Sequence, residues 1–140
     1  MSKGELLITR IIKAPPDSVF QAWTQPDQLK KWWGPAHIAC PEAHVDLRVG
    51  GEYRIANKGR DGEIIWIFGQ FEEIVVHEKL VYNWNVGTVD APASLVTVLF
   101  KSHADGTELV IKHEHIPNEE LREKHQIGWA GCMDGLEAFF

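Results

Sequence analysis

Histidine is the side chain whose ordinary pKa best suits proton transfer near neutral pH, and this chain has seven of them. Two of these, His113 and His115, lie two residues apart in a segment that alternates apolar and polar residues. We therefore expect both imidazoles on one face of a strand, together with Leu109 and Ile111. If that face looks into the protein, the histidines could contact a polar group of a ligand, transfer protons or begin a metal site. The same pattern is typical of one buried, hydrogen-bonded histidine and one near solvent at the strand end.

A second group of possible metal ligands is His37, Cys40 and His44, whose spacing H-x2-C-x3-H could supply three of them. A structural zinc site uses four ligands, and this segment offers no fourth. Short spacings of this kind arise easily in a chain with seven histidines, so the sequence favours an ordinary loop. We predict that the protein holds neither a metal nor another cofactor.

Other signatures of catalysis are missing from the sequence. There is no G-x-S-x-G motif, no glycine-rich phosphate loop with a following helix and lysine, and no base adjacent to Cys40 or Cys132. We therefore assign no catalytic residue. An enzyme of the cyclase or hydrolase type, using His113 or His115 with Tyr82 as acid or base, is an alternative that needs a histidine of tuned pKa beside a cavity.

The elements that would position these residues follow from hydrophobic periodicity. A β-branched segment, Glu5 to Lys13, predicts a first strand, and two Pro-Asp pairs then predict short helices that start at Pro16 and Pro26. Period-two alternation predicts six more strands, over residues 44–49, 52–56, 63–76, 80–86, 95–102 and 108–115. Asn118 is a good N-cap for a helix over residues 118–139. Its apolar stripe contains Leu121, His125, Gly128, Trp129, Cys132, Leu136 and Phe139.

These elements predict an α+β fold. Six consecutive strands joined by tight turns favour an antiparallel meander, and the long helix must cover its apolar face through Trp129, Cys132 and Leu136. We expect a curved sheet of about six or seven strands around this helix, in one domain over residues 1–140. The helix is still apolar at Phe139 and Phe140, so the chain either ends docked on the sheet or is trimmed.

Charge and hydrophobicity exclude several classes of partner. The net charge is −6, and no lysine or arginine cluster interrupts that background, which argues against nucleic acid. The longest apolar run, Ile64 to Phe68, is far shorter than the roughly 20 residues of a membrane span. The first residues contain no signal-peptide core, and two cysteines imply no disulfide framework, so we expect the cytoplasm.

The aromatic content is the most unusual feature of the composition. Six Trp and six Phe occur in 140 residues, and each such side chain can bury roughly 150–250 Å². We predict an enclosed cavity of several hundred Å³, the size typical of small-ligand sites, with His113 as its nearest polar group. The predicted ligand-binding residues are Tyr82, Trp84, Val98, Ile111, His113 and Trp129. Because a cavity wall and a filled core both need apolar side chains, a solid core is the alternative.

Four short segments carry a resemblance to a known family. They are APPDSVFQAW (residues 14–23), LKKWWGP (29–35), DLRVGG (46–51) and the pair Gly128-Trp129. In this order they resemble the helix-grip superfamily of START-related and Bet-v-type domains. Within it, the chain is similar to the family of the activator of the heat-shock-protein-ninety ATPase, C-terminal domain type.

The resemblance implies a cavity between sheet and long helix that holds an apolar or aromatic small molecule or a lipid. It also implies a second possibility, a co-chaperone that stimulates a heat-shock-protein-ninety-type ATPase. The eukaryotic co-chaperone makes its main chaperone contact through a separate N-terminal domain, to which nothing in this sequence corresponds. A fold alone does not define one function, so the small-molecule binder is our primary expectation.

Overall fold

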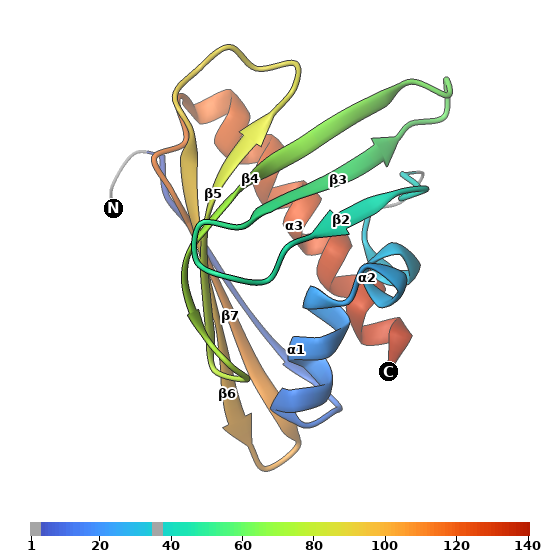
Figure 1. The fold of residues 1–140 in the computed structure, drawn as a ribbon, viewed down its shortest axis with the longest axis vertical. Coiled ribbons are helices and arrows are strands. Elements are labelled where there is room, and N and C mark those ends of the chain that lie inside the picture. The colour runs from blue at the N-terminus through green and yellow to red at the C-terminus, as the bar shows by residue number, and fades with distance from the viewer. Residues whose placement is uncertain (1–3, 35–37) are drawn as a thin grey trace.

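A computed structural model describes residues 4–34 and 38–140 of the chain (Figure 1). The elements follow in the order β1 (Leu6–Ile12), α1 (Pro16–Thr24), α2 (Pro26–Trp32), β2 (Ala43–Val45), β3 (Glu52–Lys58), β4 (Ile64–Val75), β5 (Lys79–Val86), β6 (Ser94–His103), β7 (Gly106–Glu114) and α3 (Glu119–Phe139). This is the predicted order of one strand, two short helices, six strands and a long helix, so the predicted α+β fold class is confirmed.

The seven strands form one antiparallel sheet in the order β1-β7-β6-β5-β4-β3-β2. Strands β2 to β7 are a meander, and β1 pairs with β7 because α1 and α2 carry the chain across to the far edge. The sheet curves around α3, which runs diagonally across its concave side (Figure 1). A sheet that grips a helix in this way is the helix-grip architecture.

The predicted second strand, residues 44–49, was too long. β2 ends at Val45, and the chain then turns at Gly50, whose φ of 83° belongs to the left-handed region. Gly51 approaches the backbone so closely that a Cβ atom there would lie 2.1 Å from the Asp46 carbonyl oxygen. The alternation of Leu47 and Val49 is therefore not that of a half-buried strand, and Val49 is 67% exposed.

The concave face is covered by α3 through the three residues that the stripe predicted. Trp129, Cys132 and Leu136 are all buried, which confirms the predicted packing of this helix. The C-terminal half of α3 also contacts α2. A Cβ atom at Gly135 would lie only 2.4 Å from the Trp32 carbonyl oxygen, so the absence of a side chain lets the two helices approach.

Where α1 and α2 lie against the sheet, the space between the sheet and the helices is filled. We call this region the packed end. Helix α1 lies against β6 and β7, and the Trp23 ring contacts those of Trp32 and Phe100 at centroid distances of 5.0 and 6.0 Å. Val98 and Ile111, paired on β6 and β7, are completely buried. Among the described residues, no helix has the length and hydrophobicity that crossing a bilayer requires.

Candidate functional site

A cavity of about 910 Å³ opens at the other end, between the first half of α3, the β3–β4 hairpin and the end of β5. This volume lies within the range of roughly 300–1,000 Å³ that is typical of small-ligand sites. The buried residues of its wall, Trp33, Ile67, Trp84, Trp129 and Cys132, form the inner part. The exposed residues Arg60, Asp61, Glu63, Thr88 and Lys124 form the mouth. We call this region the open end.

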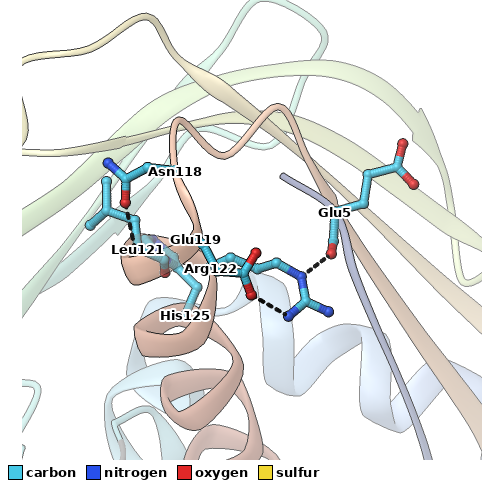
Figure 2. Close-up of polar contacts among 6 residues, drawn as sticks. All are labelled: Glu5, Asn118, Glu119, Leu121, Arg122 and His125. Carbon is cyan, nitrogen blue, oxygen red and sulfur yellow. Dashed lines mark hydrogen bonds and ion pairs between the residues drawn. The ribbon is translucent and has the colours of Figure 1, made fainter. Parts of the chain in front are cut away.

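The first turns of α3 form one wall of the cavity, and polar contacts fix where this helix starts (Figure 2). Asn118 caps the helix, as predicted, because its Oδ1 atom accepts a hydrogen bond of 2.9 Å from the Leu121 N–H. Arg122 Nε donates a 2.6 Å bond to the Glu5 carbonyl oxygen just before β1, and its guanidinium also pairs with Glu119. These contacts direct Leu121 and His125 toward the cavity.

His113 is completely buried behind Trp129, and both of its ring nitrogens are engaged. An indole N–H can only donate, so the 3.1 Å contact from Trp129 Nε1 makes His113 Nδ1 the acceptor. In a neutral ring Nε2 then carries the proton and donates to Ser94 Oγ at 2.7 Å. The Ser94 hydroxyl in turn donates a hydrogen bond of 3.3 Å to the Trp84 carbonyl oxygen. Burial and the neighbouring His125 lower the pKa of His113 to about 3.

The Ser94–His113 pair has the distance of a nucleophile and its general base, but not the proton arrangement. A general base must offer an unprotonated nitrogen to the serine hydroxyl. Here the Trp129 N–H occupies the free lone pair, so the nitrogen facing Ser94 is the protonated one. Both side chains are also buried. This geometry stabilises the core and does not support a hydrolase that uses Ser94.

His125 makes an analogous pair with Trp84 at the cavity wall. The Trp84 Nε1–H donates to His125 Nε2 at 3.1 Å, and His125 Nδ1–H donates to the Leu121 carbonyl oxygen at 2.7 Å. Burial lowers the pKa of His125, although the bond to Leu121 opposes that shift. The imidazole is therefore neutral near pH 7 and has no free nitrogen for proton transfer.

The third indole of the wall, Trp33, donates to Asn57 Oδ1 at 2.9 Å. All three indole N–H groups around the cavity are thus held by the protein's own acceptors. In the part of the chain that the structure describes, no buried side-chain nitrogen or oxygen lacks a partner. The inner wall is consequently apolar, although it is built partly from residues that can form hydrogen bonds.

The six residues predicted to bind a ligand separate into three groups. Trp84 and Trp129 line the cavity, and His113 lies directly behind Trp129. Val98 and Ile111 belong to the packed end, where α1 covers their strands, and they do not line the cavity. Tyr82 borders a separate space of only about 20 Å³. A ligand-binding role for all six stays a prediction.

The cavity differs from the predicted one in two further respects. It opens to solvent, whereas we expected it to be enclosed, and Trp33, Ile67 and His125 contribute to its wall without having been predicted. The signal for His125 was its place in the apolar stripe of the long helix. Trp33 and Ile67 carried no signal that separated them from core residues.

His115 does not share the inner face with His113, contrary to our expectation. β7 ends at Glu114, and the backbone of His115 has a φ of 64°, which turns the exposed side chain away from the strand pattern. Burial raises the pKa of Tyr82 above its ordinary value. The alternative in which Tyr82 and His113 act as acid and base is not supported by this geometry, because Ser94 and Trp129 already engage both ring nitrogens of His113.

The His37, Cys40 and His44 group is only partly described, because His37 lies outside the described residues. Cys40 Sγ donates to the Glu42 carbonyl oxygen at 3.4 Å, and His44 Nε2 pairs with the Glu42 carboxylate at 2.8 Å. This bond lowers the pKa of Glu42, while burial raises that of Cys40. Over residues 4–34 and 38–140, no cluster of three or more His, Cys, Asp or Glu could hold a metal ion.

Cys132 is the one thiol on the cavity wall among the described residues. Burial raises its pKa to about 12, which keeps it protonated near neutral pH. The thiolate is the nucleophilic form of cysteine, so this residue contributes apolar surface and not covalent chemistry.

Comparison with known proteins identifies the family. The family model described as activator of Hsp90 ATPase homolog 1-like protein matches residues 13–140. The chain belongs to this family. The resemblance on the four sequence segments is therefore confirmed, and the Hsp90-activator-like family is consistent with the helix-grip fold. A comparison with curated proteins found no match.

Several solved structures share this Hsp90-activator-like fold over nearly the whole chain. A protein from Chromobacterium violaceum is 28% identical, with 96% of each chain covered and a TM-score of 0.88. A putative uncharacterized protein from Rhizobium leguminosarum is 26% identical, with 99% of this chain and 94% of that chain covered and a TM-score of 0.79. The AHSA1-like protein from Aeromonas hydrophila is 23% identical, with 96% and 90% covered and a TM-score of 0.83.

Proposed function

We propose that the protein binds an apolar or aromatic small molecule, or the apolar part of a lipid, in the cavity of the open end. The observation that carries this proposal is a large cavity whose inner wall is apolar and has its indole donors already satisfied. Apolar surface that faces water is unfavourable by roughly 25 cal/mol for each Å², and a ligand that covers the surface removes this cost. We propose Trp84 and Trp129 as direct contacts of the ligand and His113 as the support behind Trp129.

The test uses N-phenyl-1-naphthylamine, an uncharged apolar dye whose emission rises in apolar surroundings. We expect saturable binding with quenching of Trp emission, because three indoles line the cavity. Val86→Trp places a large ring on the cavity wall and should weaken binding at least about tenfold, since the added side chain occupies the ligand's volume.

The matched control is Val49→Trp, which adds the same ring at a position that is 67% exposed and outside the cavity. This variant should bind the dye as the parent does. Absence of saturable binding to the parent, or equal binding by Val86→Trp and Val49→Trp, would contradict the proposal.

A second candidate function is contact with a chaperone of the Hsp90 type, which the family description suggests. A groove on the outer face of β3, β4 and β5 supports it: Phe68 is 43% exposed there, and the Arg54 guanidinium lies over the Trp66 ring at 5.2 Å. Aromatic and arginine side chains are enriched in protein interfaces. The parent should then raise the ATPase rate of an Hsp90-type chaperone, and Phe68→Ser should abolish this effect without changing dye binding.

We further propose that residues 1–140 act as one domain in the cytoplasm. One continuous core cluster extends from Leu6 on β1 to Leu136 on α3, and both cysteines are buried free thiols, as in a reducing compartment. Limited proteolysis of the purified protein should leave this core intact. Cleavage into two stable fragments would argue against a single domain.

A further inference from the structure

The inner wall of the cavity contrasts with its mouth in the hydrogen bonds that it can offer. Inside, the indole N–H groups of Trp33, Trp84 and Trp129 each point to an acceptor within the protein. At the mouth stand four exposed charged side chains, two cationic and two anionic: Arg60, Lys124, Asp61 and Glu63. A ligand with one polar end therefore finds charged partners at the mouth, whereas the three indoles of the wall offer it no free donor.

The acceptors that hold the indoles are not equivalent. The Trp129 N–H is held by the fully buried His113, which does not line the cavity. The Trp84 N–H is held by His125, and here both partners line the cavity. His125 is half-buried, and its Nε2 atom accepts the Trp84 N–H at the cavity wall. Removing this one acceptor would expose a donor inside an otherwise apolar wall.

Without an acceptor, the Trp84 N–H would favour ligands that carry a carbonyl or hydroxyl group at their inner end. A buried donor without a partner is unfavourable, and a ligand acceptor that reaches it gains a hydrogen bond. With the acceptor in place, a ligand carbonyl that enters first loses its water and gains no partner. The Trp84–His125 bond thus leaves the Trp84 N–H unavailable to a ligand.

We propose that His125 is a specificity-determining residue. It selects ligands whose inner end is a hydrocarbon or aromatic group without hydrogen-bonding atoms and whose polar group stays at the charged mouth. This inference rests on the proposed ligand-binding function. It concerns an amphiphilic or monosubstituted aromatic molecule, not a ligand that is polar at both ends.

The experiment compares two probes of similar shape, 2-ethylnaphthalene and 2-acetylnaphthalene, of which only the second carries an acceptor. Affinities for the parent, His125→Leu and His125→Gln are measured by calorimetry, and the ratio of the two affinities is compared among proteins. The difference in the probes' own hydrophobicity cancels in this comparison. Leucine ends one atom short of the position of Nε2, which leaves the Trp84 N–H accessible, whereas the glutamine amide oxygen can replace the lost acceptor.

We expect His125→Leu to shift the ratio toward the ketone by about tenfold, the usual worth of one good hydrogen bond. His125→Gln should restore the parent's ratio. In ¹⁵N–¹H spectra of His125→Leu, the Trp84 indole resonance should differ between the complexes with the ketone and with 2-ethylnaphthalene, because only the ketone can accept its hydrogen bond. In the other two proteins the two complexes should give nearly the same resonance. An unchanged ratio in a His125→Leu protein that binds both probes would overturn the assignment.

A second measurement needs no variant and covers the case in which His125→Leu does not fold. In the parent complex with 2-acetylnaphthalene, nuclear Overhauser contacts should join the ring protons to the Trp84 indole and the acetyl methyl group to Thr88 or Lys124 at the mouth. The reverse orientation would overturn the inference while leaving the binding function intact. Failure of the parent to bind either probe would instead refute the binding function, and the specificity with it.

Discussion

At the packed end, Trp23 lies against Trp32 and Phe100, and almost no space is left between sheet and helices. At the open end, the ring centroids of Trp84 and Trp129 lie 5.2 Å apart, and both rings face a cavity of about 910 Å³. The inward-facing residues of the strands are large and apolar at both ends. The difference lies in the covering element: α1 fills the packed end, whereas the described residues that face the sheet at the open end are the first turns of α3 together with Trp33 and Ile38.

This comparison teaches that, among the described residues, the element that covers the sheet separates the two ends, and not a special type of wall residue. The largest expected effect therefore comes from placing the same bulky side chain at the two ends. Val98→Trp adds volume where the core is closed, and overpacking of this kind costs roughly 1–3 kcal/mol or more. We expect Val98→Trp to lose cooperative unfolding or to lie more than about 3 kcal/mol below the parent in stability.

Val86→Trp is the partner experiment at the open end. Val86 lines the cavity, so we expect its stability to change by less than about 1 kcal/mol. Urea unfolding followed by circular dichroism measures both variants. Equal losses in Val98→Trp and Val86→Trp would mean that the two ends are filled alike, and the comparison would fail.

The fold was predictable because its signals are local. The Pro-Asp pairs, the Asn118 cap and the period-two segments each act over a few residues, and together they fix the order of elements. The site was only partly predictable, because Val98 and Ile67 look alike in sequence. Only the position of α1 relative to β6 and β7 separates a core residue from a cavity residue, and that position depends on contacts between distant parts of the chain.

The histidines also show that a side chain whose surroundings depend on distant parts of the chain cannot be placed from local sequence patterns. The alternation of residues 108–115 correctly indicated that His113 faces inward, but the left-handed backbone that removes His115 from the strand carries no periodic signal. The role of His125 depends on Trp84, 41 residues away in sequence. Such a pair is formed by the folded sheet and helix and has no local pattern of its own.

The second prediction concerns pH and the buried acceptor that supports Trp129. The pKa of His113 falls to about 3 in the fold, compared with about 6.5 in an unfolded chain. Between these values the unfolded chain binds a proton that the native protein does not, so stability is lost as the pH falls from about 6.5 toward 3. One such group contributes a slope of at most about 1.4 kcal/mol for each pH unit.

The control for this slope is His113→Gln, which removes the titrating ring. Carboxylates titrate in the same range, but their contribution is common to parent and variant and cancels in the difference. We expect a shallower dependence of the unfolding free energy on pH in His113→Gln between about pH 6.5 and 4. Parallel curves for the two proteins would show that His113 is not held neutral by the fold.

The third prediction uses two glycines of α3 that face the two ends. A Cβ atom at Gly135 would lie 2.4 Å from the Trp32 carbonyl oxygen, so Gly135→Ala must separate α3 from α2 and should cost about 2 kcal/mol. At Gly128 an added Cβ meets nothing within 4 Å, because the position faces the cavity. Gly128→Ala should stabilise the helix by about 0.5–1 kcal/mol. Thermal unfolding measures both, and destabilisation by Gly128→Ala would show that the open end is closed in solution.

The smallest expected effect comes from the polar contacts at the two helix starts. Asn118→Ala removes the N-cap of α3 at the open end, and Asp17→Ala removes the carboxylate that accepts from the Ser18 N–H at the start of α1, at the packed end. We expect losses of about 1 and 0.5 kcal/mol in stability, respectively.

The first turns of α3 are one wall of the cavity, so Asn118→Ala should also speed amide hydrogen exchange there and weaken binding of N-phenyl-1-naphthylamine a few-fold. Asp17→Ala should leave dye affinity unchanged, because α1 does not line the cavity. If both variants weakened the dye equally, the two ends would respond as one unit, and the cavity would depend on overall stability and not on how α3 begins.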